Sequence, residues 1–490
     1  MNINSVEGEG GKESQADSLI SKEELERSLH YSVVEVGYAG ILGNLGGGVI
    51  LTGFLLALQA SDVQIGIMGA LPFFAYLWML HGSYLVERSG DRKRITLTAL
   101  WIARSMWPIV ILLPFVHFLG IDERRVGIFL FLYAIYNIFN AIAGLAYTDW
   151  LVDLVPEDRR GRFFARRNFA LGITGMATAM LGGLFLDLWT KHIPNREMEA
   201  FAIAFAIATI AGFLSNYYLR KIAHPPIHQQ ELGGPFWKIV QRPLRDKNFR
   251  QLILLRIILD TSLNMAGPFF VVYMIREMGL GFSFATVMTT IAGATSFVSM
   301  NAWGRLSDRY GNKPLLAISI VGKGIFPLIW LWTSPQTFAL YIIAHMFGVF
   351  DAGLNLTAGN IVFELAPKAY TAIYFGVFFT AVGAASAIAP VLGGFLLQAL
   401  QGVEIHLGAV SISHFKILFL ISGIIRFATL PMLKRVHEPE AKPVGHVVRV
   451  IWNAWSMNPV EGLLQTLRYL LAPARFISKR IGRRGNANET

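Results

Sequence analysis

The chain has 490 residues, of which 54% are hydrophobic and only 15% are charged. A mean hydropathy of +0.48, together with a charged fraction far below the about 25% of soluble domains, excludes a soluble globular protein of this length. The net charge of +11 is therefore expected on loops and a tail that face anionic lipid, not nucleic acid, and the absence of cysteine excludes disulfides and thiol catalysis.

The N-terminal segment, residues 1–30, is polar and predicts a disordered cytoplasmic segment without a cleavable signal. Twelve apolar blocks follow, each about as long as a helix that crosses a hydrocarbon core of about 30 Å. The predicted spans are 34–58, 63–86, 95–118, 126–148, 168–188, 199–220, 250–276, 282–303, 315–333, 336–359, 371–398 and 414–434. The expected fold class is an all-α integral membrane protein with twelve transmembrane helices.

Lysine and arginine are concentrated in alternate connections, such as 87–94 (ERSGDRKR) and 304–314 (GRLSDRYGNKP). Because cytoplasmic loops carry the excess of positive charge, this bias places both termini in the cytoplasm. The longest connection, 222–249, contains HPPIHQQELGGP and is expected to be a cytoplasmic linker. We therefore expect a multi-pass protein of a plasma membrane, most simply a bacterial inner membrane.

The chain contains an internal duplication. Glu87-Arg88-x-Gly90 recurs as Asp308-Arg309-x-Gly311, and Leu181-Gly182-Gly183 recurs as Leu392-Gly393-Gly394. Matches of glycine and acid in the same order, in loops and in helices, predict two six-helix halves. These halves are residues 31–221 and 250–435, joined by the linker.

The charged connection 304–314 contains the pattern Gly304-x-x-x-Asp308-Arg309-x-Gly311-x-Lys313. Two six-helix halves with such a loop after the second helix of each half resemble the major facilitator superfamily. The first-half copy departs from that pattern, since Glu87 replaces the aspartate and Asp91 replaces a basic residue. The resemblance implies the fold of that superfamily and a secondary transporter, which is not an enzyme and has no cofactor or metal.

These two connections are predicted to form a cytoplasmic gate. Glycines at a helix end allow close packing in lipid, acids there can meet helix N-termini, and arginines can bridge to acids of facing loops, here Asp153 and Glu364. The alternative is a positive anchor that only fixes topology. The expected gate residues are Glu87, Arg88, Gly90, Arg92, Asp153, Gly304, Asp308, Arg309, Gly311, Lys313 and Glu364.

Polar residues inside the predicted spans indicate a solute pathway. Arg256, Asp260 and Asn264 lie at i, i+4 and i+8 and so share one helix stripe. The resemblance implies that helices 1, 4, 7 and 10 line a central cavity, where substrate and ion sites are expected. The candidate residues are Asn44, Asn137, Asn140, Arg256, Asp260, Asn264, His345, Asp351 and Asn355. Alternatively, Arg256 and Asp260 form a structural pair, and His345 is a hydrogen-bonded core residue.

Other charges at membrane depth differ in what they predict. Asp351 has no charged partner on its own helix, which favours it as a proton carrier. Glu35 is close to the predicted cytoplasmic interface and is expected to be solvated. Arg104, Lys323 and Arg426 lie near the middle of spans 3, 9 and 12 and need partners that the sequence does not identify.

The segment 436–490 contains apolar residues at helical spacing, interrupted by Pro459 and Pro473, and many arginines. No apolar stretch is long enough to span a membrane, so we expect a basic amphipathic tail on the anionic cytoplasmic leaflet. A docking site for another protein is the alternative.

Taken together, the sequence predicts a monomeric secondary active transporter of a small polar or charged solute, working by alternating access and coupled to protons. One alternative is a drug/proton efflux antiporter. The drug/proton antiporters of the superfamily that this chain resembles carry the pattern G-x-x-x-G-P-x-x-G-G on helix 5. Span 5 reads GMATAMLGG and lacks the proline, whereas span 11 carries a degenerate copy, Ala385-x-x-x-Ala389-Pro390-x-x-Gly393-Gly394. Another alternative is a membrane scaffold or sensor that acts through its basic tail. The substrate, coupling ion and direction do not follow from the sequence.

Overall fold

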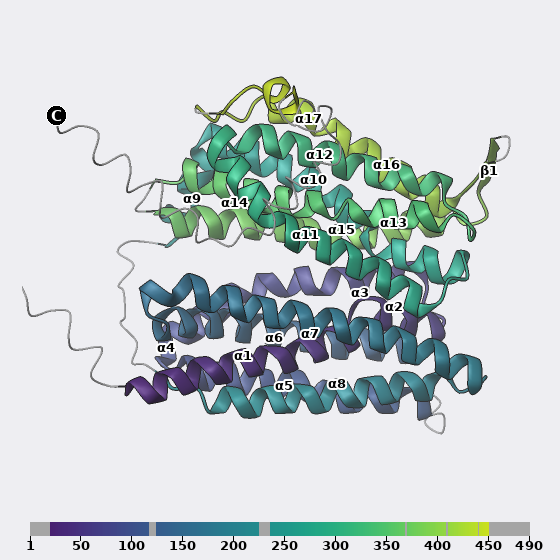
Figure 1. Ribbon diagram of the computed structural model, residues 1–490, viewed down its shortest axis with the longest axis horizontal. Helices are drawn as coiled ribbons and strands as arrows, with labels where there is room; N and C mark the ends of the chain where they lie inside the picture. The colour runs from purple at the N-terminus through teal and green to yellow at the C-terminus, as the bar shows by residue number, and fades with distance from the viewer. Residues whose placement is uncertain are drawn as a thin grey trace, which may run out of the picture. The chain divides into compact units, whose positions relative to one another are not determined.

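The computed structural model describes residues 20–116, 124–224, 236–367, 370–407, 410–439 and 441–449. The first half is helical throughout its described part (Figure 1). Its helices are α1 (Lys22–Leu45), α2 (Gly48–Ala57), α3 (Asp62–Ala75), α4 (Met79–Ser89), α5 (Arg92–Leu112), α6 (Arg125–Leu154), α7 (Glu157–His192) and α8 (Glu197–Arg220).

The second half contains helices and one β-hairpin. Its elements are α9 (Phe236–Arg245), α10 (Lys247–Val272), α11 (Phe282–Tyr310), α12 (Asn312–Ile329), α13 (Phe338–Met346), α14 (Val349–Leu365), α15 (Thr371–Ala399), β1 (Glu404–Leu407), β2 (Val410–Ser413), α16 (His414–Ala428) and α17 (Leu430–Leu433). The two strands pair antiparallel, with Glu404 opposite Ser413. This hairpin was not predicted, because it lies in the polar connection between the last two spans.

In the described part of the chain, 11 helices are long and apolar enough to cross a membrane. The remaining predicted span, 63–86, corresponds to α3 and α4, which are separated by a single 3-10 turn at Tyr76–Trp78. The predicted all-α membrane fold with twelve spans is therefore confirmed.

Helix α1 begins earlier than expected. Ser21 is its N-cap, and the Ser21 hydroxyl accepts a hydrogen bond from the Glu24 amide at 3.1 Å. Residues 22–30, which were expected to be disordered, are therefore helical. The predicted amphipathic tail cannot be compared in the same way, since residues 450–490 lie outside the described residues.

The described residues form two compact units. Unit 1 consists of Met1–Pro235, Asp260–Thr290 and Phe379–Leu418. Unit 2 consists of Phe236–Leu259, Ile291–Phe378 and Phe419–Thr490. Unit 1 thus includes the first-half helices, the C-terminal parts of α10 and α15, and the N-terminal part of α11.

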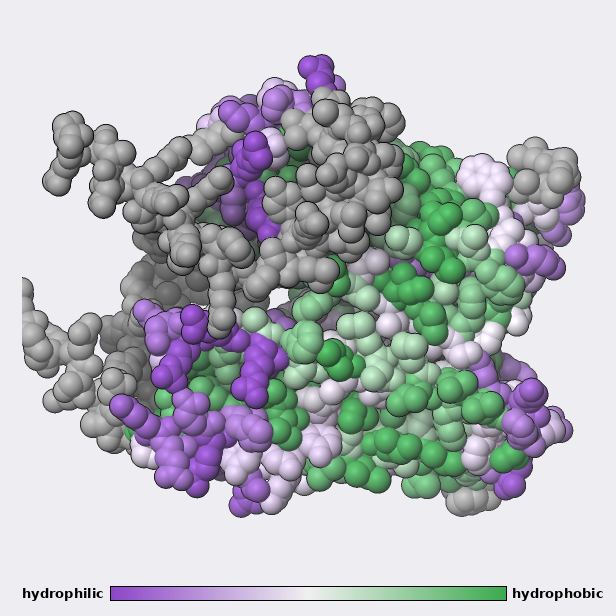
Figure 2. All heavy atoms as spheres, viewed as in Figure 1, coloured by the Kyte–Doolittle hydropathy of each residue, from purple (hydrophilic) through white to green (hydrophobic). Residues whose placement is uncertain are grey.

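Within unit 1, α1 packs against α7 and α8, while α5 packs against α6 and α8 (Figure 1). The core between these helices includes Trp150, Phe163 and Leu219. Large apolar side chains also remain exposed, such as Phe131 at 67% and Leu181 at 66%. Figure 2 shows hydrophobic residues over the middle of the first-half helices and hydrophilic residues at their ends, as lipid contact requires.

Within unit 2, the main helix contact joins α12 and α14, and α12 also packs against α13 and α17. A second core contains Trp303, Tyr310, Leu315 and Ala352, and Val447 from beyond α17 packs into it. The segment after the last helix is therefore part of the fold of unit 2.

Candidate functional site

Arg92 binds the connection between α4 and α5, where the sequence predicts a gate, to α6. It is the first residue of α5, and its side chain is buried. Its Nε lies 2.6 Å from Oδ2 of Asp149, and its Nη1 donates to Oδ2 of Asp153, both on α6. One cation therefore joins two carboxylates one helical turn apart, and the pairing expected for Asp153 is present.

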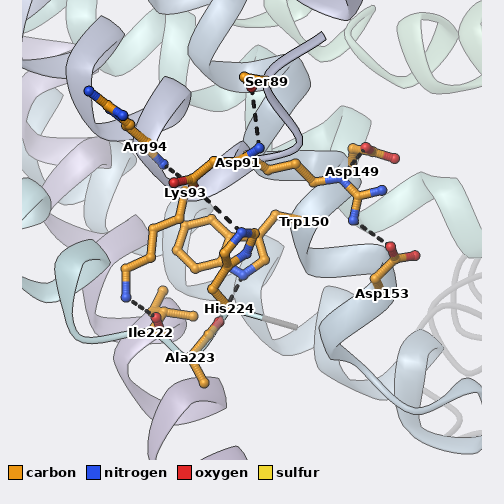
Figure 3. A network of polar contacts seen from close by, with 11 residues as sticks. Ser89, Asp91, Lys93, Arg94, Asp149, Trp150, Asp153, Ile222, Ala223 and His224 are labelled. Carbon is orange, nitrogen blue, oxygen red and sulfur yellow. Dashed lines mark hydrogen bonds and ion pairs between the residues drawn. The ribbon is translucent and has the colours of Figure 1, made fainter. Parts of the chain in front are cut away.

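Asp91 lies at the start of α5 and faces a histidine (Figure 3). Its Oδ1 accepts a hydrogen bond from the Arg94 amide at 2.8 Å, which caps the helix, and lies 3.5 Å from Nε2 of His224. Burial lowers the pKa of His224; attraction to Asp91 opposes this shift, and repulsion by Lys93 and Arg92 adds to it. His224 is therefore held in its neutral form near pH 7.

The segment that follows α8 is bound to this connection. The ammonium of Lys93 donates to the carbonyl of Ile222 at 2.6 Å, and the indole of Trp150 donates to the carbonyl of Ala223 at 2.8 Å. The Ala223 amide donates to the hydroxyl of Ser28 at 3.0 Å. The end of the first half is therefore fastened to α1, α5 and α6.

The other predicted residues of this connection are less engaged. Gly90 ends α4 with φ of +66°, a conformation that favours glycine, and its amide donates to the carbonyl of Val86 at 3.0 Å. Arg88 is exposed. The side chain of Glu87 lies outside the described residues, so its expected contact with a helix N-terminus stays a prediction.

The second-half connection places Gly311 between α11 and α12, with φ of +83°. A Cβ atom there would lie 2.8 Å from Cα of Ala441, so both conformation and space favour glycine. Asp308 and Arg309 are exposed, and the guanidinium of Arg309 lies 5.3 Å from the ring centre of Tyr310.

Glu438, which the sequence did not single out, caps α12 from beyond α17. Its carboxylate is buried and accepts hydrogen bonds from the amides of Asn312 at 2.7 Å and Lys313 at 2.5 Å. The ammonium of Lys313 donates to the carbonyl of Val436 at 2.6 Å, and the side-chain amide of Asn312 donates to Glu364 at 2.7 Å. The segment after the last helix therefore binds the connection.

The two halves repeat this arrangement. Lys93 binds the carbonyl of Ile222, just after α8, as Lys313 binds that of Val436, just after α17. The expected close packing at Gly304 has no counterpart in the described part of the chain, since a Cβ atom there would meet nothing within 4 Å.

A cluster of buried polar residues surrounds Glu35 in unit 1. The expectation that Glu35 is solvated was wrong, because its exposure is 3%. The Tyr147 hydroxyl donates to Oε2 at 3.0 Å, the Ser215 hydroxyl donates to Oε1 at 2.8 Å, and Nη2 of Arg167 lies 3.5 Å from Oε2. Arg104 joins the cluster by donating to the Ser215 hydroxyl at 2.9 Å. Five helices thus supply one ionic cluster.

A second cluster lies in unit 2 and supplies partners for two cations that the sequence left unpaired. The ammonium of Lys323 on α12 lies 2.7 Å from Oδ1 of Asp351 on α14. Nη1 of Arg426 on α16 donates to the carbonyl of Lys323 at 2.6 Å. The Asp351 side chain is 39% exposed and the Lys323 side chain 11%, so the acid is the accessible member of the pair.

One residue of the predicted stripe on α10, Asn264, forms a hydrogen bond to another helix. Arg256 and Asp260 are both buried, one helical turn apart. The side-chain amide of Asn264 donates to the carbonyl of Asp260 at 2.9 Å and to the hydroxyl of Ser386 on α15 at 3.2 Å. Asn264 thus links α10 to α15 within unit 1.

The remaining cavity candidates bond within their own helices or stay exposed. The side-chain amides of Asn44 and Asn137 donate to carbonyls four residues earlier, at 2.9 and 2.7 Å. His345 is buried, and its Nδ1 lies 2.8 Å from a carbonyl of its own helix, as a core histidine would. Asn140 and Asn355 are exposed.

Comparison with known proteins explains why the two halves of the chain are similar. The sequence profile of the Major Facilitator Superfamily matches residues 36–259 and again residues 252–478. The chain belongs to this superfamily. An uncharacterized MFS-type transporter of Methanocaldococcus jannaschii is 22% identical over 423 residues, covering 83% of this chain and 97% of that protein. The protein is therefore an MFS-type transporter and not an enzyme.

Solved structures agree on the fold. A mutant of the nucleoside transporter NupG is similar with a TM-score of 0.65 and 12% identity, covering 85% of this chain and 100% of that one. A D-xylose-proton symporter is similar with a TM-score of 0.59 and 16% identity, covering 86% of this chain and 98% of that one. At these identities the likeness is one of fold alone.

Proposed function

We propose that this transporter moves a small polar or charged solute by alternating access and couples the movement to protons. The observation that carries the proposal is the ion pair between Lys323 and Asp351 within the apolar spans of unit 2. Charges at membrane depth are costly, and they are retained where they bind a solute or an ion. The polar residues on α1, α6, α10 and α14 supply the pathway, and the two charged connections supply its cytoplasmic gate.

Asp351 is the coupling carboxylate in this proposal. When ionised it is held by the ammonium of Lys323 at 2.7 Å. A proton that binds Asp351 removes its charge and releases Lys323, whose backbone is bonded to Arg426. Protonation thereby changes the contact between α12 and α14, which is what coupling requires: a proton that favours one arrangement of the helices over another.

The test begins with a thermal-stability screen of the purified protein against metabolites and drugs at pH 5.5 and 7.5. A ligand at 100 times its dissociation constant stabilises the folded state by about 2.7 kcal/mol, which shifts the melting temperature measurably. The solute found is then followed into proteoliposomes under an imposed pH gradient. We expect Asp351→Asn to abolish the acceleration of uptake by the gradient while exchange without a gradient continues.

Asp158→Asn is the matched control, because Asp158 is an exposed acid in the first turn of α7. It should leave gradient-driven uptake unchanged. Uptake by Asp351→Asn that still follows the pH gradient would show that Asp351 does not carry the proton. Hits confined to large lipophilic cations would favour the drug/proton antiporter instead.

The proposal places both termini in the cytoplasm of a multi-pass protein of the plasma membrane, most simply a bacterial inner membrane. The bias of lysine and arginine toward one set of connections supports this orientation. We also propose that the transporter acts as a monomer and that its basic C-terminal tail lies on anionic lipid.

A further inference from the structure

Two carboxylates on first-half helices bind groups on second-half helices, and both contacts lie inside unit 1. Asp187 on α7 accepts hydrogen bonds from the amides of Phe282 at 2.7 Å and Ser283 at 2.8 Å, and the Ser283 hydroxyl donates to it as well. These groups begin α11, so Asp187 caps a helix to which it does not belong. Asp62, at the start of α3, lies 2.6 Å from Nη2 of Arg276.

The charge of the Asp187 carboxylate is not stabilised by its own helix. It lies near the C-terminus of α7, where the partial negative charge of the helix end disfavours a carboxylate. The N-terminus of α11 carries the opposite partial charge, and its first amides have no acceptor within the helix. A Cβ atom at Gly281, directly before α11, would lie 2.6 Å from Oδ2 of Asp187, so this glycine makes room for the carboxylate.

The backbones approach closely at the same places, through the second glycine of each Leu-Gly-Gly repeat. A Cβ atom at Gly183 on α7 would lie 2.8 Å from the carbonyl oxygen of Phe282. A Cβ atom at Gly394 on α15 would lie 2.6 Å from the carbonyl oxygen of Asp62. Both carboxylate contacts are thus made where a helix of one half lies tightly against a helix of the other.

The two contacts lie on the side of the membrane away from the proposed cytoplasmic gate. Helix α11 begins at Phe282, beside Asp187, and ends at Tyr310, beside the charged connection. We propose that Asp187 is the latch of an extracytoplasmic gate, with the Asp62–Arg276 pair as a second tie. Asp187 must leave α11 before solute exchanges on that side. The inference rests on the proposed function for its orientation and for its role in transport.

The test uses the absence of native cysteine. Thr286→Cys places a thiol on α11 one turn past the capped end, at a side chain that is 1% exposed. Labelling with a membrane-impermeant maleimide from the extracytoplasmic side then reports opening. Adding Asp187→Asn removes the charge and one acceptor, and we expect the labelling rate to rise about tenfold, the size of effect that losing a charged hydrogen-bond partner produces.

Glu199→Gln is the matched control, because Glu199 lies on the same side and pairs with Arg196 within its own half, at 2.7 Å. Its labelling rate should equal that of the Thr286→Cys background. An Ala208→Cys reporter, fully buried in α8, stays unlabelled while the protein is folded. If Asp187→Asn also exposes the Ala208→Cys reporter, Asp62→Asn is used in place of Asp187→Asn. Asp62→Asn should raise the labelling rate of Thr286→Cys, because it removes the second tie.

An unchanged labelling rate in the folded latch variant would overturn the latch. This outcome is separate from a failure of the proposed function, since labelling requires neither the solute nor a pH gradient. Faster labelling in a protein whose uptake ignores pH would refute proton coupling and leave the latch standing.

Discussion

At the scale of single residues, burial and the cations Lys93 and Arg92 disfavour a further positive charge at the connection between α4 and α5. A buried guanidinium is tolerated when carboxylates compensate it, and Asp149 and Asp153 both do so. These two carboxylates offset the charge of Arg92, and Lys93 is a second cation beside His224. A protonated His224 would be a further positive charge in a partly buried place, so the connection is built around a neutral imidazole.

This neutrality predicts how stability depends on pH. The folded pKa of His224 is lowered, whereas in the unfolded chain it is about 6.5. Between these two values the unfolded chain binds more protons, so the contribution of His224 is fully present above pH of about 6.5 and is lost as pH falls through the folded pKa. Melting temperatures from pH 7.5 to 5.0 should fall less steeply for His224→Gln than for the wild-type protein.

His406→Gln serves as the control, because His406 is an exposed residue of the β-hairpin. Its pH profile should match the wild type. Parallel profiles for His224→Gln and the wild-type protein would mean that His224 is as easily protonated in the folded state as in the unfolded chain.

The sequence identified charged residues within apolar spans more reliably than it identified the residues that contact them. Arg104, Lys323 and Arg426 stood out as charges within apolar spans, but their partners come from other helices. Glu35 is bonded to residues 112 and 180 positions away in the chain. Spacing along one helix gives depth and face, and says nothing about which helix packs opposite. The Arg92–Asp153 pair was foreseeable because the arginines of residues 87–94 can bridge to acids of a facing loop, and Asp153 is such an acid.

At the scale of elements, long apolar blocks determined the spans, while polar segments that fold against them escaped prediction. Helix α6 continues to Leu154 and α7 starts at Glu157, beyond the predicted ends, because helices can extend past the hydrocarbon core. The segments after α8 and α17 contain too few apolar residues to show a pattern. They are ordered because backbone carbonyls there receive hydrogen bonds from Lys93 and Lys313.

The segment after α17 predicts a measurable effect on α12. Gly311 offers this helix no side-chain cap, and Glu438 supplies the missing acceptor. Glu438→Ala should destabilise unit 2 by about 0.5–2 kcal/mol, the usual cost of losing an N-cap. Hydrogen exchange followed by mass spectrometry should show faster exchange of the Asn312 and Lys313 amides.

Glu404→Ala is the appropriate comparison, since Glu404 is an exposed acid of β1. It should leave exchange at the start of α12 unchanged. Protection of the Asn312 and Lys313 amides that survives Glu438→Ala would show that another group can satisfy them.

At the scale of the whole molecule, each unit contains a cluster of membrane charges drawn from several helices. Glu35 is accompanied by Arg104 and Arg167, and Asp351 by Lys323 and Arg426. Apolar blocks and the internal duplication were sufficient to predict a helical membrane fold with two similar halves, and the resemblance carried by residues 304–314 implied the transporter class. The substrate was not predictable, because recognition depends on side chains that different helices bring together.

The basic tail allows a decisive comparison between a transporter and a scaffold or sensor. The truncation must begin after Arg449, because the Lys442 amide donates to the carbonyl of Tyr310 at 2.9 Å and Glu438 caps α12. A cut at residue 440 would remove the first of these contacts and mix loss of the tail with damage to unit 2. With the contacts kept, a transporter should retain solute uptake after truncation, since its pathway lies in the helices.

The Asp260→Asn variant completes the comparison by changing the proposed pathway and leaving the tail intact. Asp260 is a buried carboxylate on the α10 stripe, and losing its charge should slow uptake of the identified solute at least about tenfold. Size-exclusion profiles and melting temperatures establish that both variants are folded. A scaffold predicts the reverse pattern, in which the truncation abolishes the cellular phenotype and Asp260→Asn, in a folded protein, preserves it.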